Sequence, residues 1–208
     1  QKSIMLLLSG NLGEVLIIFM AVLLGWNLPL TAVMLLWINM ITDGAPALAF
    51  SVDGYGHNIM RRPPKPRDEA ILTGRKLALI TVLGVVGTLI ALAIFRLTGG
   101  ASELESEITK ARTMVFNFVV LYEMVLVFII RCEYDVPFFS NPWVWSSVIF
   151  SIALQGILMY TPMALYFKLA PLGFFDIAKL LSGGLVFYLM FLFYQFTSSS
   201  KSNCNAGE

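Results

Sequence analysis

The stretch LTAVMLLWINMITDGAPALAF, residues 30–50, is long and apolar enough to cross a membrane, yet it carries a carboxylate near its centre, Asp43. A spanning helix needs about 20 apolar residues to cross a hydrocarbon core of about 30 Å. A charged side chain at that depth costs roughly 2.5–3.5 kcal/mol on insertion scales, and it is retained where it faces the protein interior. The stretch therefore predicts a transmembrane helix that presents Asp43 to a polar site inside a bundle.

The rest of the chain repeats this pattern of long apolar runs. Of its 208 residues 58% are hydrophobic and 13% are charged, and the mean hydropathy is +0.79. Only helices and closed barrels satisfy all backbone groups in lipid, so long runs of this kind predict helices. We expect an all-α, polytopic transmembrane bundle with six spanning helices, at residues 4–24, 30–50, 77–95, 113–130, 143–160 and 174–196.

The positions of Lys and Arg predict the orientation of the bundle. Six of these residues lie in the polar loop 51–76, and nine fall on its side of the predicted membrane against four on the other. Because basic residues are enriched in cytoplasmic loops, this loop and both chain ends are predicted to be cytoplasmic. The net charge is only +1, and the basic residues cluster at helix ends and in one loop, so nucleic-acid binding has no support.

Two further acidic residues lie in the middle of predicted spans, Glu14 and Glu123. Asparagine and threonine residues accompany the acids at helical spacing, which places them on the same helix faces. For Asn11 and Glu14 the alternative is a polar contact between helices, and for Glu123 it is a protonated side chain or a pair with Arg112 or Arg131. Three acids in the middle of spans nevertheless favour a shared site. The predicted ligand set comprises Asn11, Glu14, Asn39, Thr42, Asp43 and Glu123.

The second span is also predicted to be broken. Pro46 has no N–H to donate to the carbonyl of Thr42, and Gly44 loosens the same turn. A freed carbonyl at membrane depth is tolerated where it lines a cavity or coordinates an ion. The alternative is a simple proline kink capped by Asp43, but a kink alone does not require an acid at that depth.

The donor atoms of the predicted site indicate a hard cation. All are oxygens, and no His or Cys lies near the midplane, which argues against zinc and copper. Calcium accepts 6–8 oxygen ligands in flexible geometry, so three carboxylates suit it. Na⁺ and H⁺ remain alternatives that need less negative charge. We find no nucleotide-binding loop, phosphorylated-aspartate motif or nucleophile–base pair in the sequence.

Four segments resemble calcium-transporting P-type ATPases. LLWINMITDGAPA (35–47) is similar to their sixth transmembrane helix, and SGNLGEV (9–15) to their fifth. IMRRPP (59–64) resembles the loop between their sixth and seventh helices, and YEM (122–124) the ligand-bearing part of the eighth. The resemblance implies that residues 1–208 form the carboxy-terminal half of such a membrane domain, helices five to ten. Arg61 departs from the family pattern, because an acid would be expected there.

The resemblance also implies a function and partners. One Ca²⁺ site would use Asn11, Glu14, Thr42, Asp43 and Glu123, and a second would use Asn39 and Asp43. The partners would be the lipid bilayer and the other helices and cytoplasmic domains of an ATP-driven pump. ATP and Mg²⁺ would belong to those domains, so this chain alone would hydrolyse nothing.

The link 99–110 looks more like that of a prokaryotic pump, which implies the plasma membrane of a prokaryote, with an organelle membrane as the alternative. Two other functions stay open. One is the membrane part of a P-type pump for Na⁺ or H⁺, and the other is a non-enzymatic membrane protein with six helices.

Overall fold

The computed structural model describes residues 1–54, 72–134 and 136–204. Within these ranges every regular element is a helix, which confirms the all-α class. Two features discussed above lie outside the described residues: the loop segment 59–64 that resembles the ATPases, and Arg61 within it.

Among the described residues, six helical segments are long and apolar enough to cross a membrane, as predicted. Five are continuous α-helices: α1 (Lys2–Leu23), α4 (Gly74–Leu97), α5 (Glu105–Glu133), α6 (Pro142–Tyr160) and α8 (Phe174–Cys204). The remaining span, second in the chain, is assembled from short pieces: α2 (Ala32–Trp37), the π-helix η1 (Ile38–Thr42), α3 (Gly44–Ala49) and the 3-10 helix η2 (Phe50–Val52).

The largest differences from the predicted boundaries are at the end of α8, which reaches Cys204 rather than residue 196, and at the start of α5, which begins at Glu105 rather than near residue 113. Glu105 and Glu107 occupy its first turn, where acidic side chains interact favourably with the helix dipole. A polar extension therefore precedes the apolar run on which the prediction was based.

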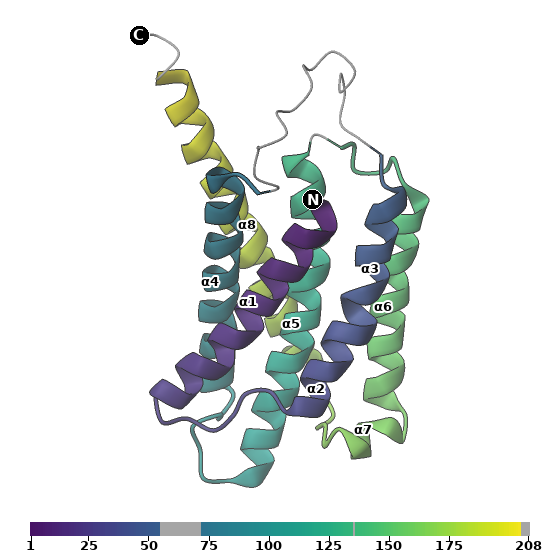
Figure 1. Ribbon diagram of the computed structural model, residues 1–208. Coiled ribbons are helices and arrows are strands. Elements are labelled where there is room, and N and C mark those ends of the chain that lie inside the picture. The colour runs from purple at the N-terminus through teal and green to yellow at the C-terminus, as the bar shows by residue number, and fades with distance from the viewer. Residues whose placement is uncertain (55–71, 135, 205–208) are drawn as a thin grey trace.

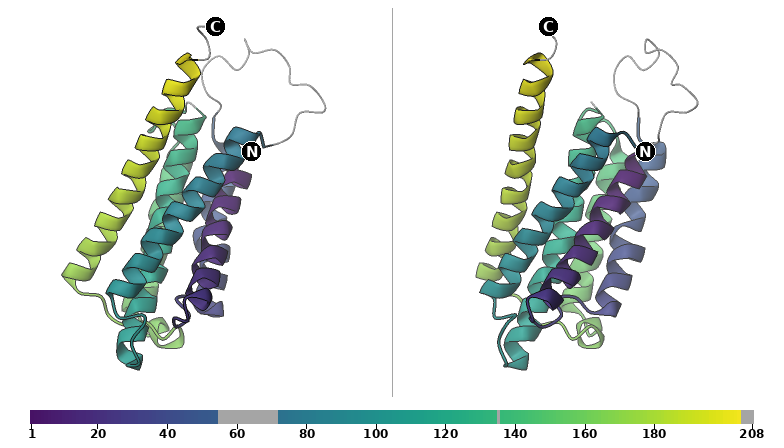
Figure 2. Two further views of the ribbon diagram at one scale, coloured as in Figure 1. Left: turned by 90° about the vertical axis from the view of Figure 1, so that its left-hand side faces the viewer. Right: turned by 60° about the vertical axis from the view of Figure 1, so that its left-hand side comes forward.

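Helix α5 lies at the centre of the bundle and packs against α1, α4, α6 and α8 (Figure 1). Of its most apolar stretch 78% is buried, against 22% for α8, which lies at the edge of the bundle (Figure 2). A helix that is apolar on all sides is expected in the interior. This position allows Glu123, halfway along α5, to be fully enclosed by protein.

Both ends of the described chain lie at the same end of the bundle. The N-terminus and the last turns of α8 are together at the top of Figure 1. Six crossings require this arrangement. Which side of the membrane this end faces remains a prediction from the basic residues.

Small residues bring α1 close to its neighbours. A Cβ atom added to Gly13 would lie 2.5 Å from the Tyr122 hydroxyl oxygen, and one added to Gly84 would lie 3.1 Å from Leu12. The Thr88 hydroxyl of α4 lies 3.3 Å from the carbonyl of Gly13 across this interface and 2.8 Å from the carbonyl of Gly84 in its own helix. Close helix approach through small residues is typical of membrane interfaces. The consequence is that α1 packs directly against the middle of α5.

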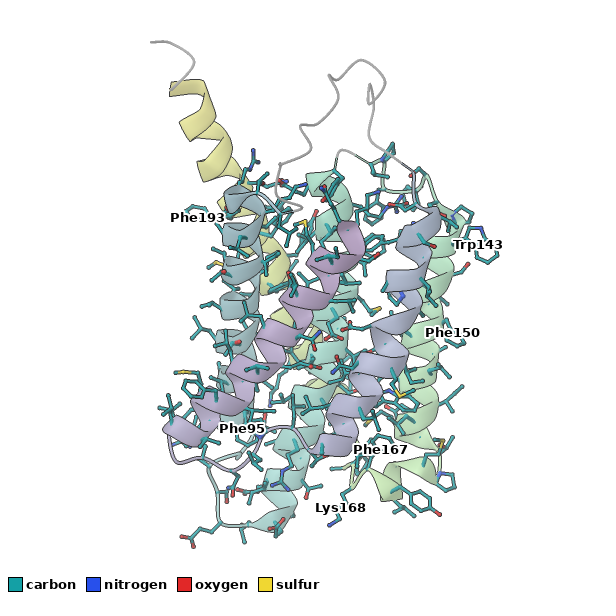
Figure 3. All side chains as sticks on the ribbon, viewed as in Figure 1. Phe95, Trp143, Phe150, Phe167, Lys168 and Phe193 are labelled. Carbon is teal, nitrogen blue, oxygen red and sulfur yellow. The ribbon has the colours of Figure 1, made fainter. Side chains whose placement is uncertain are left out.

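The link between α6 and α8 contains a short helix, α7 (Met163–Tyr166), that the sequence did not predict. Phe167, which follows it, packs edge-to-face on Trp37 with ring centroids 5.5 Å apart. The Phe167 ring, labelled in Figure 3, is also stacked on Phe116 of α5, with ring centroids 6.4 Å apart. The link therefore folds back under the bundle and covers the start of the second span.

A buried ion-pair cluster closes the opposite end of the bundle. Asp53, just after η2, lies 2.7 Å from Lys2 Nζ of α1 and 3.5 Å from Arg131 Nη2 of α5. The Asn141 side chain, at the start of α6, donates to the same carboxylate at 3.0 Å. The side chains of Asp53 and Arg131 are at most 1% exposed. This cluster, Lys2–Asp53–Arg131–Asn141, connects four of the six spans.

Candidate cation site

Three acidic side chains from three separate spans meet in the interior of the bundle. Glu14 belongs to α1, Asp43 joins η1 to α3, and Glu123 belongs to α5. Their exposed fractions are 4%, 1% and 0%. A Cβ atom added to Gly10 would lie 3.2 Å from Glu123 Oε1 and 3.4 Å from Asp43 Oδ2, so these two carboxyl groups face the same point. The predicted convergence of the acids is thus present in the fold.

Polar neighbours satisfy only part of this carboxyl cluster, Glu14–Asp43–Glu123. Glu14 Oε2 accepts a hydrogen bond from the Asn39 amide at 2.9 Å. Glu123 Oε2 lies 3.4 Å from the Thr42 hydroxyl, which has a single hydrogen and lies closer, at 2.8 Å, to the carbonyl of Ile38. The other Glu14 oxygen, the other Glu123 oxygen and both oxygens of Asp43 are buried without a donor. Asp43 and Glu123 can hydrogen-bond to each other only when one of them carries a proton.

No basic side chain compensates for these acids within the part of the chain that the structure describes. The ion pairs found there join Lys2 and Arg131 to Asp53, Arg75 to Glu133, and Lys110 to Asp176. Buried carboxylate oxygens without a donor or a counter-ion are strongly unfavourable. The carboxyl cluster therefore requires a positive charge that these residues do not supply, either a cation or protons.

The carboxyl groups alone do not form a complete metal site. Among the residues described, no group of three or more His, Cys, Asp or Glu side chains is arranged to hold a metal ion. A cation at this position would have to draw neutral oxygens from the neighbouring helices, or the side chains would have to close around it. The amide and hydroxyl groups nearby are the candidates for these neutral oxygens.

The predicted neutral ligands differ in their placement. Thr42 is fully buried between the acids, whereas Asn39 is exposed on the face of the second span. Asn11 is half-buried, and its amide donates to the carbonyl of Leu7 in its own helix, at 2.7 Å. The hydrogen bonds described for Asn11 do not reach the acids. The structure therefore brings Asn39 and Thr42 to the cluster by direct contact, but not Asn11.

The break in the second span differs from the predicted one. The Asp43 N–H bonds to the carbonyl of Ile38, five residues back, at 2.9 Å, so the irregular turn is a π-helix that precedes Gly44. The carbonyl of Thr42, which Pro46 leaves without a backbone donor, accepts from the Ser151 hydroxyl of α6 at 3.4 Å. In this conformation the carbonyl accepts a hydrogen bond from a neighbouring helix, and because its oxygen has a second lone pair, its role as a cation ligand stays a prediction.

Three residues that sequence reasoning did not assign also shape the site. Tyr122 is fully buried, and its hydroxyl donates to the carbonyl of Gly10 at 3.2 Å, which closes the site between α1 and α5. Ser151 and Gln155 of α6 contact the two ends of η1. In the sequence, the only signal of their role was the spacing of four between polar residues along this span, which begins with Ser147.

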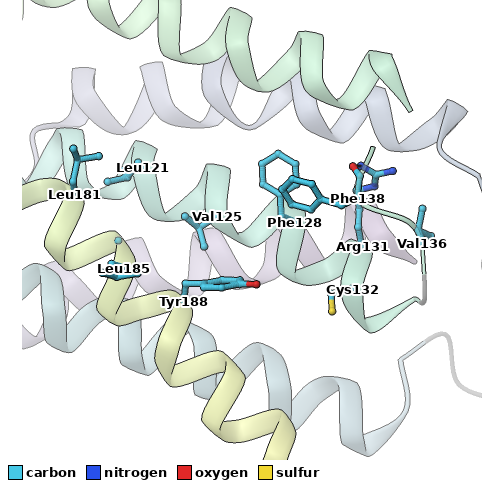
Figure 4. Close-up of a pocket in the computed structure, with 11 residues that line it drawn as sticks. Leu121, Val125, Phe128, Arg131, Cys132, Val136, Phe138, Leu181, Leu185 and Tyr188 are labelled. Carbon is cyan, nitrogen blue, oxygen red and sulfur yellow. Dashed lines mark hydrogen bonds between the residues drawn. The ribbon is translucent and has the colours of Figure 1, made fainter. Parts of the chain in front are cut away.

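A separate cavity of about 610 Å³ lies between α5 and α8 (Figure 4). Its α5 wall includes Leu121 and Val125, each two residues from Glu123 and so on the other side of the helix. Its lining is almost entirely apolar, with Arg131 and Cys132 at one end. This cavity therefore faces away from the carboxyl cluster and is not the candidate cation site.

Comparison with known proteins gives a consistent family assignment. Residues 27–197 match the family model described as "Cation transporting ATPase, C-terminus". Calcium-transporting ATPase 1 of Bacillus cereus is 30% identical over 178 residues, which is 78% of this chain and 20% of that protein. The calcium-transporting ATPase of Bacillus subtilis is 32% identical over 171 residues, 78% of this chain and 18% of that protein.

A eukaryotic relative matches a shorter part of the chain at higher sequence identity. The endoplasmic reticulum calcium ATPase srcA of Aspergillus fumigatus is 44% identical over 88 residues, 40% of this chain and 9% of that protein. The chain thus spans about a fifth or less of the length of these relatives. The family match covers most of the six-helix bundle, and the chain belongs to the cation-transporting ATPase family as a carboxy-terminal, membrane-spanning part.

Proposed function

We propose that this chain is the cation-binding part of a calcium pump and that the carboxyl cluster binds Ca²⁺ during transport. One observation carries the proposal: three buried carboxyl groups from three spans meet, four of their oxygens lack a donor, and no described basic side chain neutralises them. A divalent cation at this position would remove the repulsion between the acids and satisfy the open oxygens.

The proposed ligands are the acids together with the nearest neutral oxygens. Thr42 Oγ1 already lies beside Glu123, whereas Asn39 contacts Glu14 through its amide nitrogen and would offer its amide oxygen to the cation. Asn11 would have to turn its amide oxygen toward the site, because its nitrogen is engaged with Leu7. Calcium tolerates such a mixed, flexible oxygen shell. The full proposed set is Asn11, Glu14, Asn39, Thr42, Asp43 and Glu123.

The similarity to calcium ATPases of three organisms supports calcium as the transported ion. In a complete pump, ATP and Mg²⁺ would act in cytoplasmic domains, and further helices would pack against this bundle in the bilayer. Domains that couple ATP hydrolysis to a movement of η1 would withdraw Asn39, Thr42 and Asp43 together and release the ion. We place the pump in a prokaryotic plasma membrane, with the loop 51–76 and both chain ends in the cytoplasm.

Equilibrium binding of ⁴⁵Ca²⁺ to the chain in lipid nanodiscs tests the proposal. We expect saturable binding that weakens at least about tenfold in Asp43→Asn, because removing one partner of a buried charge pair typically costs about 3–5 kcal/mol. Glu105→Gln removes an exposed acid of α5 and should leave binding unchanged. Equal binding by wild type and Asp43→Asn would overturn the proposal, as would binding of Na⁺ that excludes Ca²⁺ at equal concentration.

A further inference from the structure

The π-helix η1 is held at both ends by one neighbouring helix. At its start, the Trp37 indole N–H donates to Gln155 Oε1 at 3.0 Å. At its end, the carbonyl of Thr42 accepts from the Ser151 hydroxyl at 3.4 Å. Ser151 and Gln155 are four residues apart, so they lie one turn apart on the same face of α6. Their two contacts bracket the irregular turn.

The contact at Thr42 replaces a donor that the second span lacks. In a regular α-helix this carbonyl would accept from the N–H of residue 46, which is proline. An unpaired carbonyl at membrane depth is strongly unfavourable. Ser151 is fully buried and supplies the donor from α6. The bond therefore favours the backbone conformation in which this carbonyl points toward α6.

The contact at Trp37 is tied to the helix that carries Glu123. Gln155 donates through Nε2 to Asn117 Oδ1 of α5 at 3.1 Å. Asn117 in turn donates to the carbonyl of Thr113 in its own helix, at 2.8 Å. A chain of side-chain hydrogen bonds thus runs from the second span through α6 to α5. This chain of hydrogen bonds fixes the position of η1 along the axis of α5, and so relative to Glu123.

The register of η1 decides where the site residues face. Asn39, within the turn, contacts Glu14, and Thr42, at its end, contacts Glu123. A π-helical turn holds one extra residue, so reverting to α-helical register would rotate the following residue, Asp43, by roughly 100°. That rotation would move Asp43 away from the point it shares with Glu123.

On the basis of the function proposed above, we propose that Ser151 and Gln155 are positioning residues of the cation site. They hold η1 in its π-helical register, and this register keeps Asp43 beside Glu123. Neither side chain needs to touch the ion. Their effect on cation affinity is exerted through the backbone of the second span.

The test compares Ser151→Ala, Gln155→Leu and the double variant with Ser147→Ala. Ser147 is a matched control, because it is buried one turn earlier on α6 but donates to the Val144 carbonyl of its own helix at 2.8 Å. Amide hydrogen exchange by NMR reports directly on η1 through the Asp43 N–H. We expect exchange at Asp43 to be roughly tenfold faster in the double variant, with no change in Ser147→Ala.

Cation affinity provides the second measurement, made well below the unfolding temperature. We expect ⁴⁵Ca²⁺ binding about threefold weaker in each single variant and roughly tenfold weaker in the double variant. A purely structural role would lower the unfolding temperature and leave the dissociation constant unchanged, so an unchanged constant overturns the inference. If the wild-type chain binds no Ca²⁺, the proposed function fails, and the exchange at Asp43 alone decides whether α6 holds the turn.

Discussion

At the scale of single residues, the site is defined by carboxyl oxygens that the protein leaves unsatisfied. Asp43 has no donor for either oxygen, and Glu14 and Glu123 each have one oxygen without a donor. Such groups destabilise the bundle unless a cation or protons neutralise them. Stability and cation binding should therefore respond in opposite directions when an acid is removed.

Glu123→Gln should stabilise the cation-free protein and weaken Ca²⁺ binding. The amide supplies a donor for the neighbouring Asp43 carboxylate and removes one charge from the cluster, a gain of about 1–3 kcal/mol. Thermal unfolding in chelator, followed by circular dichroism, measures the first effect. Glu105→Gln, which alters an exposed acid on the same helix, is the control. A lower unfolding temperature for Glu123→Gln would contradict this account.

Gly13→Ala should destabilise the contact between α1 and α5. The added methyl group would lie 2.5 Å from the Tyr122 hydroxyl, so either the tyrosine or the helix must move, at a loss of about 1–3 kcal/mol. Gly156→Ala is the matched control, because a Cβ at Gly156 meets nothing within 4 Å. Thermal unfolding of both variants should show a decrease only for Gly13→Ala; equal unfolding temperatures would refute the close approach.

At the scale of elements, the sequence predicts the spans better than their internal geometry. Long apolar runs locate all six crossings, because hydrophobicity and length alone determine them. The π-helical turn is not predictable in this way, because no residue type specifies a bond from Asp43 to Ile38. It depends on Ser151 and Gln155 of α6, which contact it only in the folded bundle.

The cluster Lys2–Asp53–Arg131–Asn141 should be the main electrostatic link between elements. Asp53→Asn leaves the buried Arg131 without its counter-ion, and removing one partner of a buried pair typically costs about 3–5 kcal/mol. Arg75→Gln disrupts a pair whose arginine side chain is 64% exposed, and should change stability by less than about 1 kcal/mol. Unfolding in mixed micelles with increasing sodium dodecyl sulfate measures both changes. Similar losses of stability in the two variants would contradict this prediction, because the buried pair would then stabilise the protein no more than the exposed pair does.

At the scale of the whole molecule, an even number of crossings places the two chain ends together, as Figure 1 shows. The basic residues predict that this end is cytoplasmic. Green fluorescent protein fused to either end should fluoresce in a bacterial host, and alkaline phosphatase fused there should be inactive. Alkaline phosphatase inserted in the link 99–104 should be active. The reverse pattern would invert the predicted topology.

The sequence predicts the part of the candidate site that follows from the cost of burying charged side chains in a membrane. Three acids at mid-span depth implied convergence, and the fold brings Glu14, Asp43 and Glu123 together. Asn11 and Asn39 could not be placed from spacing alone, since helix rotation and neighbouring contacts decide whether an amide faces the site. Ser151 resembles any serine on an apolar helix until its partner, the Thr42 carbonyl, is known.

The central claim, that the three acids act as one cation site, is tested most directly by carboxyl modification. Dicyclohexylcarbodiimide labelling of the chain in nanodiscs, quantified by mass spectrometry across a Ca²⁺ titration, reports on each acid separately. We expect Glu14, Asp43 and Glu123 to become protected together with a single Ca²⁺ midpoint, while the exposed Glu105 shows no protection. Protection of the three acids at different midpoints, or no protection by Ca²⁺, would contradict the account.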